Sequence, residues 1–308
     1  MPYFSQLDAL RFAAALLVVW SHAIGNNAFH HGELGRLGVL VFFLISGFVN
    51  YQSLLKDASL SRFGIKRFFR LYPAFMVSLL AAAACWGITI PQLLCNVTML
   101  PSLLGQREAI GVYWTLEIEV LFYLSLLFFS RLELLQRPVF LVAAISAFVT
   151  SGLYWQHLRN IGAIHPPDAY RKFLLFFAVL YLGALYGWAW QRSAWKYALF
   201  GTVLAMGALS IPSHARLWEL ATYWMSPVIF WGVLKWGANM PQWISGLGKL
   251  AYSMYLFHPF LVQWLPSNWV ARCVALPILT IPLAFLVYFL VEDPLNRLGH
   301  HLAKAGRD

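Results

Sequence analysis

Long apolar runs separated by short polar turns fill almost the whole chain. Ten runs are long enough for a helix to cross the hydrocarbon core of a bilayer, which takes about 20 residues at a rise of about 1.5 Å each. They predict spans at residues 7–25, 37–55, 72–90, 113–130, 138–155, 172–190, 195–211, 218–235, 248–265 and 272–291. No composition break interrupts this pattern. We therefore predict an all-α, polytopic membrane bundle of about ten transmembrane helices, forming a single domain over residues 1–308.

The composition agrees with a membrane protein. The chain is 60% hydrophobic and only 11% charged, whereas soluble domains contain about 25% charged residues. The net charge is +10. With the N-terminus placed inside, Lys and Arg favour the inner segments by about two to one, which predicts a multi-pass protein with both termini cytoplasmic. The charge therefore indicates topology, and no nucleic acid is expected as a partner. The three cysteines lack metal-ligand spacing, so we predict no metal site.

The first predicted span carries three polar residues, Asp8, Arg11 and His22. Arg11 and His22 are eleven positions apart, so on a helix they share one stripe, roughly 16 Å apart along the axis. A charged residue inside a membrane is expensive and usually faces the interior of a bundle. This span is therefore predicted to form the inner wall of a polar site within the membrane.

The second span has small residues for close helix approach. Gly35, Gly38, Ser46 and Gly47 recur along it. Small residues let helix backbones approach each other in a membrane. We interpret these positions as packing sites.

Residues 61–73 form the densest basic stretch, at the predicted inner side of the membrane. Lys66, Arg67 and Arg70 are interleaved with aromatic residues, and Arg67 and Arg70 share a helical face. Two arginines on one face can hold a phosphate through bidentate hydrogen bonds. The alternative, equally compatible with the stretch alone, is an anchor on anionic lipid.

Two acids open the span at 113–130. Glu117 and Glu119 are two apart, so they cannot share a helical face. Glu119 precedes an unbroken apolar run and is the better candidate to face the bundle, where His22 is its natural partner. A carboxylate bonded to one imidazole nitrogen raises the basicity of the other. The alternative is a polar contact between helices without chemistry.

The span at 248–265 holds a third polar group. Tyr255 and His258 are three apart and can share a face, and Pro259 directly after His258 predicts a local kink. We expect Tyr255, His258 and Glu117 to line a substrate site. A hydrogen-bonded packing role is at least as compatible with His258.

At six places the chain resembles the membrane acyltransferase-3 family, whose members modify bacterial surface glycans and other acceptors. The matching pieces stand in family order and are LDALRFAAALLVVWSHA at 7–23, GVLVFFLISGFV at 38–49, RFFRLYPAF at 67–75, YWTLEIEVLFYL at 113–124, LGKLAYSMYLFHP at 247–259 and VEDPLNR at 291–297. The weakest match lies between 135 and 240. The resemblance implies an enzyme of the bacterial inner membrane that transfers an acyl group from a cytoplasmic acyl-CoA to an acceptor hydroxyl.

The resemblance also implies residue roles. His22 matches the catalytic histidine and Arg11 its paired arginine, while Arg67 and Arg70 match a motif that acts with the acyl donor. Glu119 matches a catalytic acid; many relatives carry two adjacent acids there, whereas here Val120 follows and the second acid is Glu117. Which of the two serves stays open.

From these residues we expect O-acyl transfer, with acetyl-CoA as the donor and a sugar hydroxyl of a glycan or glycolipid as the acceptor. The donor phosphates would bind Lys66, Arg67 and Arg70, and His22 would act as general base or form a transient acyl-imidazole. Arg11 would contact either the donor or the oxyanion. The alternative from another class is a secondary transporter or flippase for an acyl or glycan lipid, since buried Arg, His and Glu also suit a carrier.

Overall fold

The computed structural model describes residues 4–25, 31–56, 59–162, 168–211, 217–237, 240–266 and 268–305. Within these ranges all regular secondary structure is helical, which confirms the predicted fold class. The helices form two compact units that alternate along the sequence. Unit 1 comprises Met1–Gly38, Ser59–Val120 and Gly237–Asp308, and unit 2 comprises Val39–Ala58 and Leu121–Trp236.

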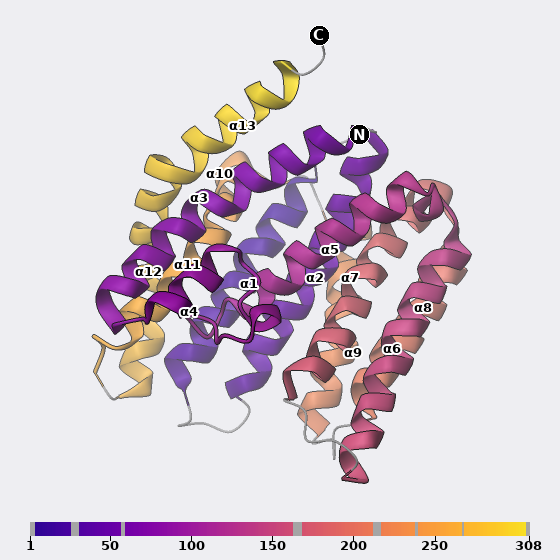
Figure 1. Cartoon of the computed structure of the whole chain (residues 1–308), viewed down its shortest axis with the longest axis horizontal. Helices are drawn as coiled ribbons and strands as arrows, with labels where there is room; N and C mark the ends of the chain where they lie inside the picture. Colours follow the sequence, from indigo (N-terminus) through magenta and orange to yellow (C-terminus); the bar gives the residue numbers. More distant parts are fainter. Residues whose placement is uncertain are drawn as a thin grey trace. The chain divides into compact units, whose positions relative to one another are not determined.

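Unit 1 contains most of the polar segments singled out in the sequence. Its helices are α1 (Ser5–Ile24), the start of α2 (His31–Lys56), α3 (Leu60–Trp86), α4 (Ile90–Val97), η1 (Ser102–Leu104), the start of α5 (Trp114–Arg131), α10 (Gln242–Leu247), η3 (Gly248–Leu250), α11 (Ala251–Val262), α12 (Trp269–Val287), the π-helical turn η4 (Tyr288–Glu292) and α13 (Asp293–Ala305) (Figure 1). Helix α1 packs against α10, α11 and α12.

Small residues bring α1 close to its neighbours. A Cβ added at Gly38 would lie 2.6 Å from the carbonyl oxygen of Ala14, and one added at Gly248 would lie 2.2 Å from that of Asp8. Any side chain at these positions would push the backbones apart. The predicted packing role of Gly38 is therefore confirmed, and α1 is held tightly along its length.

Helix α3 is longer than the predicted span at 72–90. It begins at Leu60, where the Ser59 side chain caps it by accepting a hydrogen bond from the backbone N–H of Arg62, and it continues through Pro73. Serine is a favoured N-cap because its oxygen satisfies one of the free N–H groups. The basic stretch is thus the first half of the same helix that enters the apolar region, so its cations sit on a rigid element.

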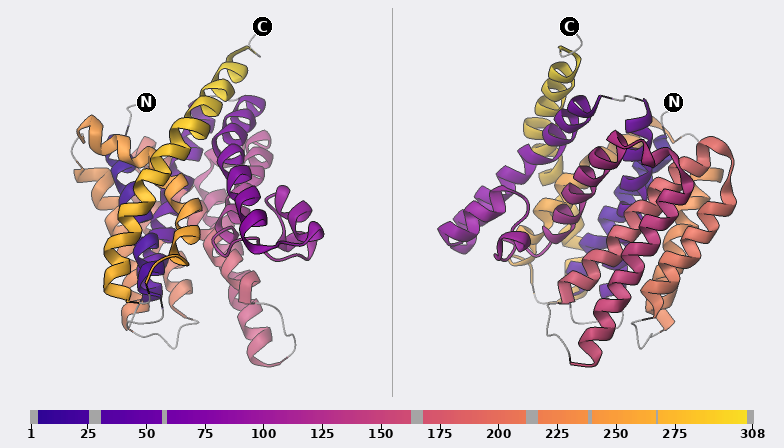
Figure 2. Two further views of the ribbon diagram at one scale, coloured as in Figure 1. Left: turned by 90° about the vertical axis from the view of Figure 1, so that its left-hand side faces the viewer. Right: turned by 45° about the vertical axis from the view of Figure 1, so that its right-hand side comes forward.

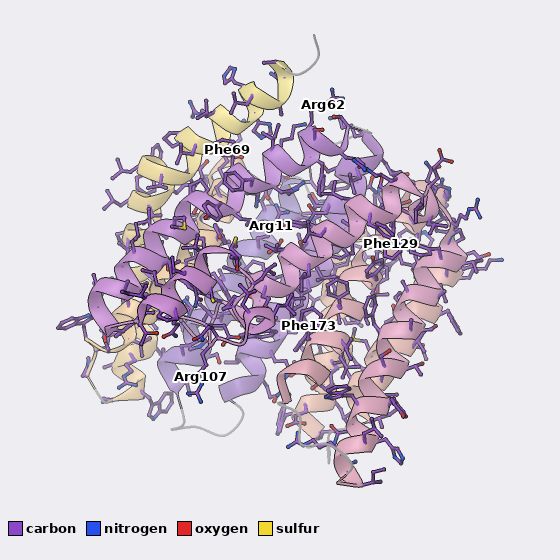
Figure 3. All side chains as sticks on the ribbon, in the orientation of Figure 1. Arg11, Arg62, Phe69, Arg107, Phe129 and Phe173 are labelled. Atoms are coloured by element: carbon purple, nitrogen blue, oxygen red, sulfur yellow. The ribbon has the colours of Figure 1, made fainter. Side chains whose placement is uncertain are left out.

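The last predicted span also continues beyond its expected end. Helix α12 passes through the π-helical turn η4 into α13, and the Asp293 carboxylate is 2.6 Å from the Arg297 guanidinium one turn on. Helix α13 lies along α3, as both views of Figure 2 show. The contact is closest at Gly299, where an added Cβ would lie 2.4 Å from Cβ of Phe69, which is labelled in Figure 3.

Unit 2 contains the rest of α2 and α5, together with η2 (Leu134–Gln136), α6 (Pro138–Asn160), α7 (Asp168–Arg192), α8 (Trp195–Ser210) and α9 (Leu217–Trp236). Helices α6, α7 and α8 pack side by side (Figure 1). A Cβ at Gly47 would lie 2.0 Å from the carbonyl oxygen of Leu180, so α2 and α7 are in backbone contact. The packing role predicted for Gly47 is confirmed. Aromatic rings, including Phe122, Phe177 and Tyr181, fill the core of this unit.

Six helices are long and apolar enough to cross a membrane by length and composition: Ser5–Ile24, Gly32–Lys56, Leu60–Trp86, Pro138–Asn160, Phe173–Arg192 and Trp269–Ala305. All ten predicted runs fall on helices, but α8 has 16 residues and α11 only 12, fewer than the roughly 20 that a straight crossing needs. The chain is a multi-pass membrane protein, and the predicted count of about ten transmembrane helices is not confirmed.

Candidate active site

His22 lies in the last turn of α1 with its ring exposed. Its Nδ1 atom is 2.9 Å from the carbonyl oxygen of Val18, one turn earlier on the same helix. A carbonyl oxygen can only accept a hydrogen bond, so the hydrogen-bond pattern assigns the proton to Nδ1. In the neutral ring the lone pair is then on Nε2. The fold therefore presents His22 with a base-competent nitrogen directed away from its own backbone.

His258 repeats this arrangement on α11. Its side chain is fully buried, and its Nδ1 atom is 3.0 Å from the carbonyl oxygen of Met254. The next residue, Pro259, has no N–H, so the helix lacks one of its regular backbone hydrogen bonds at this turn. By the same reasoning as for His22, the proton is on Nδ1 and the lone pair on Nε2.

The two imidazole rings lie against each other. Their centroids are 4.8 Å apart and their planes meet at 63°, an edge-to-face arrangement. On the other side of His258, the ring of Tyr255 has its centroid 6.2 Å away. The prediction that Tyr255 and His258 share a helical face is confirmed. The sequence did not predict that this face would meet His22.

The Tyr255 hydroxyl anchors α11 to the start of α5. It donates a hydrogen bond to the carbonyl oxygen of Val112 over 2.8 Å and lies 2.7 Å from Oγ1 of Thr115. The Glu119 carboxylate, one turn after Thr115, is within electrostatic range of the same hydroxyl. Glu119 is therefore on the side of α5 that faces α11, as its sequence position suggested.

Glu117 has a different environment. It is buried, with a side chain that accepts a hydrogen bond over 3.2 Å from the backbone N–H of Leu103. Ser102 and Glu108 are its other polar neighbours. Glu117 therefore ties α5 to the loop before it, whereas Glu119 faces Tyr255. The proposed hydrogen bond between Glu119 and His22 stays a prediction, since the ring placed against His22 is that of His258.

A cluster of cations lies where α3 and α13 pack together. We call it the basic cluster; its members are Lys66, Arg67, Arg70, His300 and Lys304. The four other cations all act electrostatically on His300. The α3 members were predicted from the sequence, and Arg67 has its guanidinium 5.1 Å from the centroid of the Phe63 ring. Several positive charges held on two packed helices form a site suited to a polyanion.

The two α13 members were missed because the last span was predicted to end near residue 291. A signal for this helix does exist in the sequence. Leu295, Leu298 and Leu302 recur at intervals of three and four residues, the spacing of an amphipathic helix. That spacing would have predicted a helix with Arg297, His300 and Lys304 on its polar surface.

A short polar connection joins the basic cluster to α11. Glu292, the last residue of the π-helical turn, is buried, accepts a hydrogen bond from the Ser253 hydroxyl and interacts electrostatically with Arg70. π-Helical turns of this kind occur frequently at functional sites. Ser253 and His258 are five residues apart on α11, about 7.5 Å along its axis. The histidine pair lies at the middle of this short helix, and the link to the basic cluster lies in its first turn.

Arg11 lies apart from the histidines. Its guanidinium forms an ion pair with Asp8 one turn earlier on α1, and both side chains are largely shielded. Helix geometry places Arg11 roughly 16 Å along the axis from His22. The structure therefore brings together His22, His258, Tyr255 and Glu119. Arg11 lies farther along α1, away from these residues.

Comparison with known proteins identifies the family. A family model described as an acyltransferase domain, of the acyltransferase-3 family, matches residues 4–292. The chain belongs to the acyltransferase-3 family. Its match spans both units, including the region between 135 and 240 where the sequence motifs were weakest.

Three relatives agree with this family assignment. Nodulation protein 10 of Rhizobium leguminosarum bv. viciae is 25% identical, over 96% of this chain and 94% of its own length. ORF330 of Acidianus two-tailed virus, named as an acetyltransferase, is 26% identical over 85% of this chain and 81% of its own. Acyltransferase MdmB of Streptomyces mycarofaciens is 30% identical over 41% of this chain and 39% of its own length. No solved structure matches the chain.

This acyltransferase-3 protein is accordingly an acyltransferase built on membrane helices. The family assignment favours an enzyme over the transporter or flippase alternative. Unit 1 contains a histidine on α1 whose Nδ1 is bonded to its own helix, and the basic cluster on α3 and α13.

Proposed function

We propose that this protein transfers an acyl group, acetyl foremost, from a cytoplasmic acyl-CoA to a hydroxyl of a glycan or glycolipid, in the bacterial inner membrane and with both termini cytoplasmic. The observation that carries the proposal is the His22 ring, exposed and with Nδ1 bound to its own helix, so that Nε2 is left as the base. Histidine is the side chain most often used for general-base catalysis.

In the proposed step, the acceptor hydroxyl attacks the thioester carbonyl. A C–O bond forms, the hydroxyl proton moves to Nε2 of His22, and the C–S bond then breaks. The CoA thiolate leaves and takes the proton back from His22, so the enzyme returns to its starting state. Direct transfer of this kind needs a ternary complex, whereas an acyl-imidazole on Nε2 would give ping-pong kinetics.

The basic cluster supports acyl-CoA as the donor. CoA carries about four negative charges on its phosphates, and charge-assisted hydrogen bonds from arginine are among the strongest available to a protein. Lys66, Arg67 and Arg70 would bind these phosphates, with the α13 cations His300 and Lys304 beside them. The Glu292 carboxylate, which interacts electrostatically with Arg70, would help to hold it at this site.

The length of α11 makes this arrangement compatible with one substrate. The donor thioester hangs on a long flexible arm, and the distance from Ser253 to His258 along α11 is only about 7.5 Å. A donor bound at the basic cluster would therefore extend its thioester toward His22. Arg11 is too far along α1 to reach an oxyanion beside His22, so we propose that it contacts the donor instead.

We assign the acceptor to the side of the site formed by α11 and α5. Tyr255 and His258 would line it, Glu119 would support the positive charge that forms on His22, and Glu117 would fix the loop that borders it. A sugar offers several hydroxyls, and tyrosine and histidine side chains can donate hydrogen bonds to them or accept hydrogen bonds from them.

The test is thioester consumption by the purified full chain in lipid nanodiscs. We expect release of free CoA thiol from acetyl-CoA to depend on an acceptor extract of surface glycans, and the mass of one glycan species to rise by one acetyl group. Surface glycans of cells with this protein should carry the same acetyl group, and glycans of cells without it should lack it. Absence of thioester consumption with a panel of acyl-CoA donors would overturn the proposed donor.

A further inference from the structure

The His258 side chain contains an acceptor atom for which the described part of the chain supplies no donor. The residue is 0% exposed, and its Nε2 atom has no hydrogen-bond partner there. Buried polar atoms are nearly always paired, because an unpaired one loses its hydrogen bonds to water and so carries a cost in stability. A histidine kept only for packing could be replaced by an apolar ring without that cost. The unused lone pair therefore calls for a donor that arrives during function.

The donor is indicated by the ring that lies against it. With centroids 4.8 Å apart, the two imidazoles are close enough for ring nitrogens to approach hydrogen-bonding distance. In the resting state both Nδ1 protons are directed to backbone carbonyls of their own helices, so both Nε2 atoms are acceptors. Two acceptors cannot bond to each other. The pair is thus one proton short of a hydrogen bond.

Catalysis by His22 would supply that proton. We propose that His258 is a positioning residue: when Nε2 of His22 takes the proton of the acceptor hydroxyl, the new N–H shares a three-centre hydrogen bond between the acceptor oxygen and Nε2 of His258. This inference rests on the proposed function. The hydroxyl O–H bond breaks, the N–H bond forms on His22, and His258 accepts a hydrogen bond without becoming protonated. The proton leaves with the CoA thiolate, and the pair returns to two acceptors.

His258 fits this role better than the other polar groups nearby. The Tyr255 hydroxyl already donates to Val112, and Glu119 acts on that hydroxyl. His258 is also held rigidly, because Nδ1 is bound to the Met254 carbonyl oxygen over 3.0 Å. A fixed acceptor stabilises a charge only when it forms, which is the requirement for lowering a barrier rather than tightening substrate binding.

The kinetic test compares side chains that fill the site with and without an acceptor. We expect His258→Phe to lower kcat about 10- to 100-fold, with little change in KM for acyl-CoA, because one strong hydrogen bond to the charged state is lost. His258→Gln, whose amide oxygen can accept a hydrogen bond, should recover part of this loss. His157→Phe, at an exposed histidine of α6, is the matched control and should retain wild-type kcat.

Chemical rescue distinguishes the effect of the His258 lone pair from the effect of the volume that the ring fills. His258→Ala leaves space for a small ring, so added imidazole should raise kcat several-fold, whereas pyrrole, of equal size but without the lone pair, should not. Equal rescue by both compounds, or full activity in His258→Phe, would show that His258 only fills space and would overturn the inference.

A second measurement needs no substrate. In protein labelled with ¹⁵N-histidine, protonation of His22 should shift the Nε2 resonance of His258, and His22→Gln should abolish the shift. Failure of acyl-CoA turnover in the wild-type protein together with this coupling would contradict the proposed function but not the pair. Turnover in the wild type without the coupling would contradict the pair alone.

Discussion

The two units of this protein use their buried polar residues differently. In unit 2 they tie helices together: Gln52 donates to the carbonyl oxygen of Gly187 over 2.9 Å, and Gln191 donates to Gln52 over 2.6 Å. In unit 1 they also link helices, but the buried His258 ring lies against the exposed His22 ring, and its Nε2 atom has no partner in the described part of the chain. The proposed function places the chemistry in unit 1, and in unit 2 the structure shows close helix packing.

The sequence resemblance follows the same division. Four of the six matching pieces, including those with His22, Arg67 and Arg70, fall wholly in unit 1, while the weakest stretch, 135–240, lies in unit 2 up to Trp236. Unit 2 is defined by close backbone contacts and aromatic packing, which many sequences can satisfy. A reaction site needs particular groups at particular places. Substitutions in the two units should therefore fail in different ways.

The largest expected effect is the loss of the base. His22→Ala should lower kcat by about 10² to 10⁴-fold, the usual contribution of a general base. Membrane insertion and thermal stability should stay close to wild type, because the ring is exposed and its Nδ1 bonds only its own helix. The measurement is thiol release from acyl-CoA in nanodiscs, beside a melting curve.

The matched control for this substitution is His157→Ala, another exposed histidine but in unit 2. It should leave both kcat and the melting curve unchanged. If His22→Ala were fully active, the assignment of the chemistry to unit 1 would collapse. If His157→Ala lost activity to the same degree, histidine loss itself would be disruptive, and the comparison would carry no information on the site.

The next effect in size concerns donor binding. Arg70→Ala should raise KM for acyl-CoA by about 10- to 100-fold and change kcat little, because a charge-assisted hydrogen bond is worth about 1.5–3 kcal/mol. Arg297→Ala removes a cation from α13 that is 76% exposed and paired with Asp293, so its KM should match wild type. An acyl-pantetheine without the nucleotide should show no difference between the two variants. A KM raised equally by both variants would indicate a general charge effect.

Most of the helices could be predicted from the apolar runs in the sequence. The helical segments that could not be predicted are those in which apolar runs are interrupted. Every predicted run is helical, because a long apolar run in a bilayer must satisfy its backbone internally. The helical basic stretch was not predicted to continue into the span at 72–90, and α13 was missed altogether, since charged residues interrupt the apolar pattern although they continue the same helices.

The candidate site was predictable in its parts but not in its pairing. Helical spacing correctly placed Tyr255 and His258 on one face and put Glu119, rather than Glu117, toward α11. Spacing within a helix says nothing about which helix lies opposite. The contact between His22 and His258 joins residues more than two hundred positions apart, so it required the tertiary structure.

A smaller effect, on stability alone, is expected in unit 2. Gly47→Ala should lower the free energy of unfolding by about 1–3 kcal/mol, because the new Cβ would meet the carbonyl oxygen of Leu180 and force α2 and α7 apart. Gly207→Ala, in α8 with nothing within 4 Å of the added Cβ, is the control and should match or exceed wild-type stability. Melting curves in detergent test both variants, and the folded fraction of Gly47→Ala should keep wild-type KM for acyl-CoA.

The smallest effect gives the sharpest comparison, because each unit has a buried tyrosine whose hydroxyl is hydrogen-bonded. Tyr255 in unit 1 donates to Val112, and Tyr181 in unit 2 donates to Ser125 over 3.0 Å. Replacing either by Phe deletes one hydroxyl and should lower stability by about 1 kcal/mol. Only Tyr255→Phe should also lower kcat, by less than about tenfold, because α11 then loses its anchor to α5 and the His258 ring its fixed position. Equal kcat in the two variants would mean that the anchor serves stability alone, and unit 1 would then confine its chemistry to the histidine pair and the basic cluster.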